Sequence, residues 1–166
     1  MLESERRQVT QSLRNQREES LMKLTFRPYS ESDRQACIDI FDANCPEYFA
    51  PNERQDYDEF LEVAPEDYEI CESDGRVLGA FGLFVDTENV KTLNWILLDP
   101  HAQGLGVGSK IMERVIHLVR ASETRTVRIA ASHKSAPFFA RFGATTISST
   151  KDGWGPNMDR VDMLLS

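Results

Sequence analysis

Three glycines at alternate positions, Gly104, Gly106 and Gly108, separate an apolar run from a helix-like run within residues 99–116, DPHAQGLGVGSKIMERVI. The first amides of a helix have no partner within the helix, and the helix dipole is positive at that end. Glycine also lets a ligand approach the backbone closely. The turn is therefore predicted to bind an anion, and phosphate is the expected ligand.

Two common phosphate-binding loops do not fit this spacing. The dinucleotide fingerprint G-x-G-x-x-G requires its third glycine at the position of Ser109. The Walker loop requires Gly-Lys-Ser/Thr, whereas the order here is Gly108-Ser109-Lys110. Neither a Rossmann dinucleotide site nor a Walker nucleotide site is predicted.

A third pattern does fit, namely Gln103-x-x-Gly106-x-Gly108, preceded by Asp99-Pro100. It resembles the Q/R-x-x-G-x-G/A motif of the GNAT superfamily of acyl-CoA-dependent N-acyltransferases, in which the loop amides hold the pyrophosphate of coenzyme A. A later segment, FFARFGA, resembles the F-Y-x-K/R-x-G-F segment of that family. Its matching residues are Phe138, Arg141 and Gly143. The resemblance covers most of the chain, from about residue 24 onward.

The resemblance implies an N-acetyltransferase that moves an acetyl group from acetyl-CoA directly to a primary amine of a small molecule, without a metal. It also implies that the backbone of a strand ending at Leu97 and Leu98 pairs with the pantetheine arm of the co-substrate. The predicted cofactor-binding residues are Leu97, Leu98, Gln103, Gly104, Leu105, Gly106, Val107, Gly108, Ser109, Phe138 and Arg141. Many family members form homodimers, and the sequence leaves the oligomeric state open.

The two usual catalytic positions depart from the family. The usual base is a Glu on the strand before the glycine loop, and that position falls on Asn94, which can orient a water but cannot take a proton. The usual acid is a Tyr, and its position holds Phe139. His133 follows a strand-like run, and histidine titrates close to neutral pH. We therefore predict His133 and Asn94 as the catalytic residues.

The acceptor is predicted to contact Glu47 and Tyr48, between the first two helices of the domain, where this family builds its acceptor pocket. Asp159 and Arg160 are a further candidate pair. Two other functions stay open. A non-catalytic acyl-CoA-binding regulatory module would keep the glycine loop and need no base, and a protein N-acyltransferase would use a polypeptide acceptor. A shared fold cannot choose among acceptors.

The elements that must position these residues follow from hydrophobic periodicity and turn signals. The pattern predicts the order β-αα-βββ-α-β-α-ββ, a mixed α/β fold with a central β-sheet flanked by helices. Asp74-Gly75 predicts a tight hairpin turn between two of the strands. Asn52 is the expected N-cap of the second helix, and Glu53 suits the positive end of that helix.

Composition narrows the setting. Residues 1–21 are polar and free of aromatic residues, so we expect an N-terminal extension, helical or disordered, before a single domain at 22–166. The net charge of −8 makes nucleic acid an unexpected partner. No apolar stretch has the ~20 residues of a membrane helix or the core of a signal peptide. Three cysteines without metal-ligand spacing indicate reduced thiols in a cytoplasmic protein.

Overall fold

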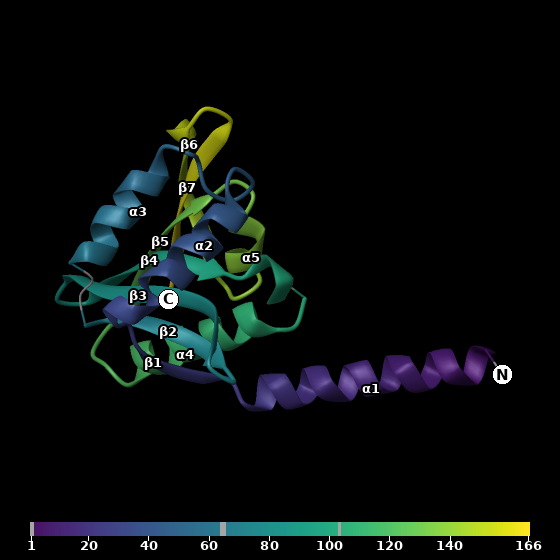
Figure 1. Cartoon of the computed structure of the whole chain (residues 1–166). Coiled ribbons are helices and arrows are strands. Elements are labelled where there is room, and N and C mark those ends of the chain that lie inside the picture. The colour runs from purple at the N-terminus through teal and green to yellow at the C-terminus, as the bar shows by residue number, and fades with distance from the viewer. Residues whose placement is uncertain (1, 64–65, 103) are drawn as a thin grey trace.

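The protein was analysed as a computed structural model, which describes residues 2–63, 66–102 and 104–166. Seven strands of this described chain form one sheet in the order β1-β2-β3-β4-β5-β7-β6 (Figure 1). The strands are β1 Thr25–Pro28, β2 Tyr68–Ser73, β3 Arg76–Thr87, β4 Val90–Leu98, β5 Thr126–Ser132, β6 Thr145–Gly155 and β7 Met158–Leu165. The helices are α1 Leu2–Met22, α2 Arg34–Asn44, α3 Glu53–Glu62, α4 Val107–Arg120 and α5 Ala136–Ala140, with short 3-10 turns at Glu31–Asp33 and Pro100–Ala102.

Strands β4 and β5 form the one parallel pair of this sheet, and they pair over a short length. Val90–Leu93 lies against Thr126–Ile129, after which β4 continues to Leu98 and β5 to Ser132 without pairing to each other. Every other neighbouring pair is antiparallel. The sheet therefore opens into a wedge between the carboxyl ends of its two central strands.

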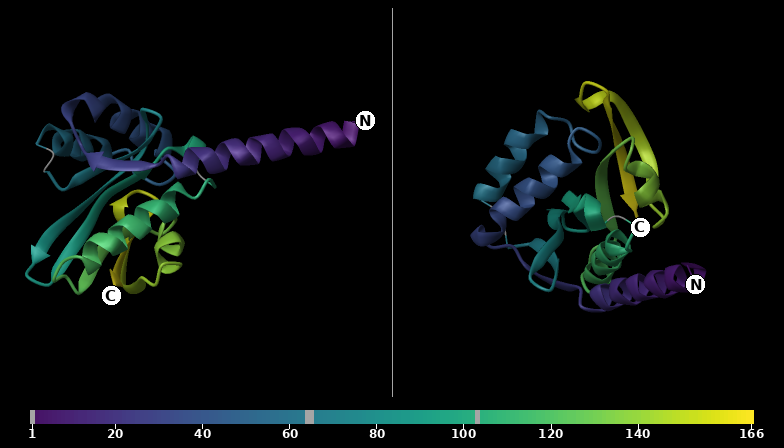
Figure 2. Two further views of the ribbon diagram at one scale, coloured as in Figure 1. Left: turned by 90° about the horizontal axis from the view of Figure 1, so that it is seen from below. Right: turned by 45° about the vertical axis from the view of Figure 1, so that its right-hand side comes forward.

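Helices cover both faces of the sheet (Figure 2). On one face, α2 and α3 bury Phe41, Tyr57 and Leu61 against β2 and β3. On the other face, α4 and α5 bury Ile111 and Phe139 in a second core. Two separate cores thus hold the sheet from either side, which fixes the positions of the strands that border the wedge.

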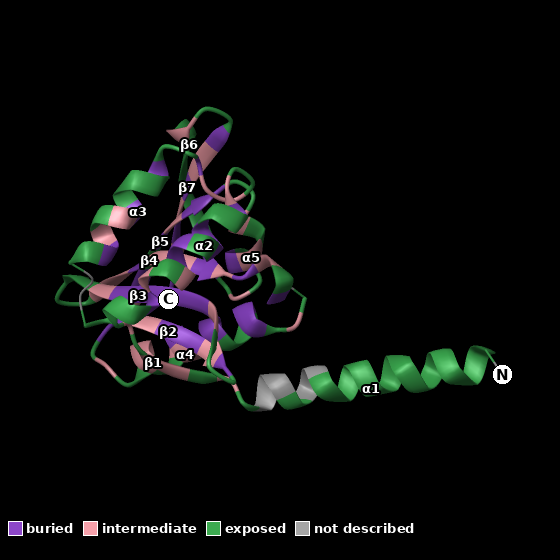
Figure 3. Ribbon diagram, in the orientation of Figure 1, coloured by how far each residue is buried: buried purple, intermediate pink, exposed green. Residues whose placement is uncertain are grey.

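Helix α1 lies outside this sandwich and projects away from it (Figures 1 and 3). Its apolar residues Leu2, Val9 and Leu13 are 74%, 59% and 51% exposed. The extension is helical in the structure, which is one of the two alternatives that the sequence left open. No helix in the described part of the chain has the length and apolar character needed to cross a bilayer.

The predicted order of elements after the extension is confirmed. The hairpin turn is confirmed too, because Asp74 and Gly75 both have positive φ, 51° and 76°, which a two-residue turn of this kind requires. One detail differs from expectation. The Asn52 side chain makes no cap hydrogen bond to α3, and its amide nitrogen donates to the carbonyl of Trp154.

Candidate active site

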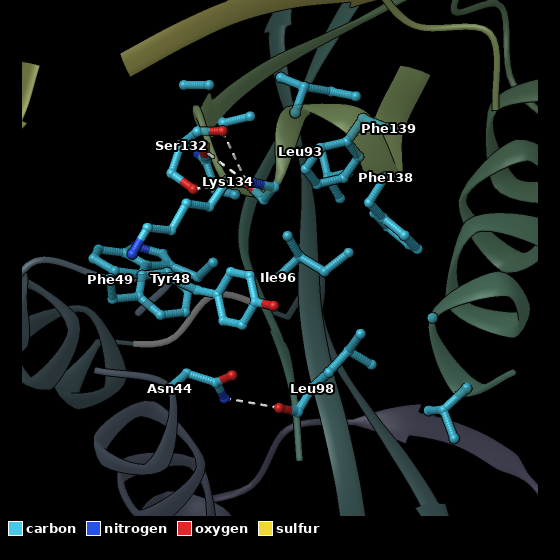
Figure 4. Close-up of a pocket in the computed structure, with 18 of the residues that line it drawn as sticks. Asn44, Tyr48, Phe49, Leu93, Ile96, Leu98, Ser132, Lys134, Phe138 and Phe139 are labelled. Carbon is cyan, nitrogen blue, oxygen red and sulfur yellow. Dashed lines mark hydrogen bonds between the residues drawn. The ribbon is translucent and has the colours of Figure 1, made fainter. Parts of the chain in front are cut away.

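The wedge between β4 and β5 holds a cavity of about 710 Å³, a volume typical of small-molecule sites (Figure 4). It is bordered by the ends of β4 and β5, the start of α4, helix α5, the segment joining α2 to α3, and the end of β6. One cavity thus contacts both faces of the sheet and both halves of the chain.

A bulge in β4 shapes the middle of this cavity. Asn94 pairs with Gly82 and Leu97 pairs with Ala80, so two residues of β4, Trp95 and Ile96, lie opposite a single residue of β3. Trp95 has φ of 49°, which is uncommon for a residue other than glycine. As a result, the three consecutive residues Asn94, Trp95 and Ile96 all line the cavity. Bulges of this kind often re-aim side chains beside active sites.

The glycine turn forms one end of the cavity. Gly104 and Gly106 have φ of 78° and 82°, and a Cβ added at either position would meet no atom of the other described residues beyond its chain neighbours within 4 Å. Gly108 is required for a different reason, because a Cβ there would lie 3.0–3.1 Å from the side chains of Phe138 and Leu98. The open space beside the first two glycines is therefore available to a ligand.

Helix α4 begins at Val107 within this turn, and its N-cap residue, Gly106, has no side chain that could bond the first amides. Val107, Gly108 and Ser109 all line the cavity. Two cationic residues, Lys134 and Arg141, line it as well, in a chain whose net charge is −8. Of the two, Arg141 is near this turn, because its guanidinium lies over the ring of Phe138, which packs beside Gly108. The first amides of α4, the positive end of the helix dipole and this cation make this end of the cavity suited to an anion.

The opposite end of the cavity is aromatic and partly closed. Phe49, Trp95 and Trp154 line it, and the rings of Phe49 and Trp95 stack with centroids 6.4 Å apart. The amide nitrogen of Asn52 donates to the carbonyl of Trp154 at 2.8 Å, and the indole Nε1 of Trp154 donates to the carbonyl of Ala131 at 2.9 Å. These bonds join the β6–β7 hairpin to the α2–α3 segment and to β5 across the mouth of the wedge.

The model of the acetyltransferase (GNAT) family matches residues 37–144, well over half of the chain. The chain belongs to the GNAT acetyltransferase family. It is therefore an enzyme of the class that transfers an acetyl group to an amine. No curated protein matches the chain.

Several solved structures are similar to this GNAT chain. Ard1 from Thermoplasma volcanium has a TM-score of 0.73 and 17% identity, over 86% of this chain and 97% of that one. The ribosomal-protein-S18-alanine N-acetyltransferase from Escherichia coli has a TM-score of 0.70 and 17% identity, over 86% and 92%. N-acetylglutamate synthase from Neisseria gonorrhoeae, complexed with coenzyme A and L-arginine, has a TM-score of 0.62 and 16% identity, over 84% and 32%. At these identities the likeness concerns the fold.

Most of the residues predicted to hold the GNAT co-substrate lie around the cavity. Those that line it are Leu98, Gly104, Gly106, Val107, Gly108, Ser109, Phe138 and Arg141. The side chains of Leu97 and Leu105 do not line it, because Leu97 is buried in the core under α2 and α3 and Leu105 packs against the core under α4. Gln103 lies outside the described residues.

The two predicted catalytic residues are not brought together. Asn94 lines the cavity from β4. His133 is exposed and does not line the cavity, because hydrogen bonds to the backbone of β7 hold it just after the end of β5. The amide of His133 donates to the carbonyl of Asp159 at 3.0 Å, and its ring nitrogen Nδ1 accepts from the Asp159 amide at 3.1 Å. Phe139, at the position of the usual GNAT tyrosine, is buried and contacts the cavity with an apolar ring.

Only one of the two residues predicted to contact the acceptor lines the cavity. Tyr48 lines the cavity, and Figure 4 shows its hydroxyl pointing toward the strand that carries Ile96 and Leu98. Glu47, the residue before Tyr48, is exposed and does not line the cavity. Asp159 and Arg160 are not among the lining residues either, although the Arg160 guanidinium stacks over the Trp154 ring at 5.1 Å.

Sequence reasoning missed Glu53 as a site residue. This side chain lines the cavity and is only 7% exposed, and its Oε2 accepts a hydrogen bond from the Ala50 amide at 2.7 Å. Burial raises the pKa of its carboxyl to about 7. Its position at the start of α3 favoured a role at the helix dipole, and nothing local to the sequence indicated that distant segments would bury it. In the described residues, no cluster of side chains is arranged to bind a metal ion.

Proposed function

We propose that this GNAT enzyme transfers the acetyl group of acetyl-CoA directly to the primary amine of a small molecule. The observation that carries this proposal is a single cavity with two chemically different ends. The turn at Gly104–Ser109 suits a diphosphate, and the aromatic end near Trp95 and Trp154 suits a compact organic amine. The wedge between β4 and β5 connects the two ends.

The described residues fit coenzyme A. The amides of Val107, Gly108 and Ser109 would hold its diphosphate, and Arg141 would add a positive charge beside them. The apolar side chains of Leu98 and Phe138 would cover the pantetheine arm. The thioester of the bound co-substrate supplies the activated acetyl group.

Direct transfer from acetyl-CoA to the amine is supported by the burial and the raised pKa values of two cysteines. Cys37 and Cys71 are buried, and burial raises the pKa of these thiols to about 11 and about 12. Neither they nor Cys45 line the cavity. Because the thiolate is the nucleophilic form, these residues are unsuited to carrying an acetyl group between donor and acceptor.

A small acceptor is supported by the bridge at the mouth of the wedge. The bond from Asn52 to the Trp154 carbonyl ties the β6–β7 hairpin to the α2–α3 segment beside the aromatic end, and we expect this tie to limit the room for a polypeptide acceptor. A protein substrate would have to break this bridge or present a very short terminus.

Titration calorimetry with acetyl-CoA, followed by measurement of coenzyme A release with free primary amines and with short peptides, tests this proposal. Binding together with faster turnover of a free amine than of any peptide is the expected result. Failure to bind acetyl-CoA would refute the assignment of the loop. Binding without turnover would favour a regulatory module, and preference for a peptide would favour a protein acetyltransferase.

A further inference from the structure

Glu53 is a buried carboxylate without a cationic partner. Its exposed fraction is 7%, and its one hydrogen bond among the described residues comes from the Ala50 amide. No lysine, arginine or histidine of the described chain forms an ion pair with it. Buried carboxylates are normally paired, because removing an unpaired charge from water is costly. This one instead borders an open cavity.

The surroundings of Glu53 explain why it stays unpaired within the protein. The other titratable groups that line the cavity are Tyr48, Lys134 and Arg141. Those near Glu53 on its own segments are Cys45, Arg54 and Asp56, and Arg54 is already paired with Asp42. Burial is the main cause of the rise in the pKa of Glu53 to about 7, and the negative charge of Asp56 contributes to the same rise. Arg141 packs over the Phe138 ring, whereas the Lys134 side chain extends from the segment after β5 toward Phe49 and Tyr48 (Figure 4), and neither cation forms an ion pair with Glu53.

We propose that Glu53 binds the ammonium group of the acceptor and takes its proton, so that it is the base that Asn94 cannot be. This inference rests on the function proposed above. One N–H bond of the ammonium breaks, and its proton passes to the Glu53 carboxylate. The neutral amine then attacks the thioester carbonyl, the C–N bond forms and the C–S bond breaks. The second amine proton ends on the coenzyme A sulfur, and Glu53 releases its proton to solvent.

The position of Glu53 agrees with this role. It lines the same cavity as Tyr48, Phe49 and Trp95, where the acceptor is expected. An alkylamine with a pKa of about 10.4 is almost fully protonated at pH 7, so a carboxylate can recognise it by charge before accepting the proton. A general base is most effective when its pKa lies near the working pH, and it typically contributes about 10²–10⁴-fold in rate.

Glu53→Gln is the decisive variant, because a glutamine oxygen can still accept the hydrogen bond from the Ala50 amide. Glu59→Gln, an exposed substitution on the same helix, is the matched control. With the best amine of the panel, we expect Glu53→Gln to lower kcat/KM at least 100-fold while the calorimetric Kd for acetyl-CoA stays within twofold. The acidic limb of the wild-type kcat/KM profile, near pH 7, should also disappear. Unchanged kcat/KM in Glu53→Gln would overturn the proposal.

A second measurement does not depend on turnover. Carboxyl ¹³C NMR, with the Glu53 signal assigned by its absence in Glu53→Gln, follows the ionisation of this group directly. Ethylammonium chloride at 0.1 M should lower its titration midpoint relative to sodium chloride at equal ionic strength, since a bound cation favours the charged form. A midpoint that ethylammonium does not move would overturn the role of Glu53. Failure of the wild type to bind acetyl-CoA would instead refute the proposed function, while a midpoint moved by ethylammonium would still show that Glu53 binds an ammonium group.

Discussion

Replacing Ser109 by aspartate should separate two properties of the α4 N-terminus, since the new charge should stabilise the helix and repel a diphosphate. Ser109 is the third residue of α4, is exposed and lines the cavity. A carboxylate in the first turn of a helix is worth about 0.3–1 kcal/mol through the dipole. For a protein of this size, that corresponds to a rise in Tm of about 1–3 °C.

The same carboxylate should weaken acetyl-CoA binding. Two like unit charges about 4 Å apart repel by about 1 kcal/mol in a water-like dielectric, and a diphosphate presents two of them. The sum, about 2 kcal/mol, corresponds to a Kd about 30-fold higher. Because salt screens exposed charges, the effect should be larger at low ionic strength.

Calorimetric titration of acetyl-CoA and thermal melting of the unliganded protein provide the two measurements, with Ser109→Asn as the neutral control. We expect Ser109→Asp to melt higher and bind more weakly than Ser109→Asn. Equal acetyl-CoA affinity in the two variants would show that the diphosphate does not lie at the start of α4. A lower Tm for the aspartate variant would contradict the helix start at Val107.

Three further outcomes are expected. Removing residues 2–21 should leave the acetyl-CoA affinity within twofold and the Tm within about 2 °C, because the described side chains of residues 2–16 are exposed. Titration calorimetry and thermal melting measure these two quantities. Between about pH 4.5 and 7 the folded chain binds an extra proton at Glu53, so its free energy of unfolding should fall as pH rises, by at most about 3 kcal/mol. Urea titrations at pH 5 and pH 8 should show a smaller decrease in the free energy of unfolding for Glu53→Gln than for the wild type. Trp154→Ala should raise the KM for a small amine about tenfold and leave the acetyl-CoA affinity within twofold, because the substitution opens only the aromatic end of the cavity. Steady-state kinetics measures the KM, and calorimetry measures the affinity.

The parts of the fold that could be predicted are those with local causes. The Asp74-Gly75 turn depends on two residues that tolerate positive φ, and α4 depends on the apolar spacing that places Ile111 and Val115 on one face. The glycine turn was predictable from its spacing alone. The reason for each glycine was not, because Gly108 is constrained by Phe138, a residue from a later element.

The parts that could not be predicted depend on contacts between distant segments. Nothing near Asn52 indicates that its side chain bonds to Trp154 instead of capping α3. Glu53 becomes buried because the same segments meet, so its altered pKa is a property of the assembled fold. The contacts of His133 were equally out of reach, because its partner, the Asp159 backbone, comes from a strand 26 residues later in the chain.

The short pairing of β4 with β5 also bears on how the chain avoids aggregation. Beyond Leu93, β4 has no neighbouring strand on the side of the wedge, which leaves an edge of the kind that recruits other polypeptides. Edge strands of soluble proteins usually carry charges or prolines that discourage such pairing, yet Trp95, Ile96 and Leu98 are apolar. Here the edge faces the cavity, and the α2–α3 segment, α4, α5 and the β6–β7 hairpin of the same chain surround it, which is a geometric form of protection. A strand edge can therefore stay unpaired at the centre of the sheet.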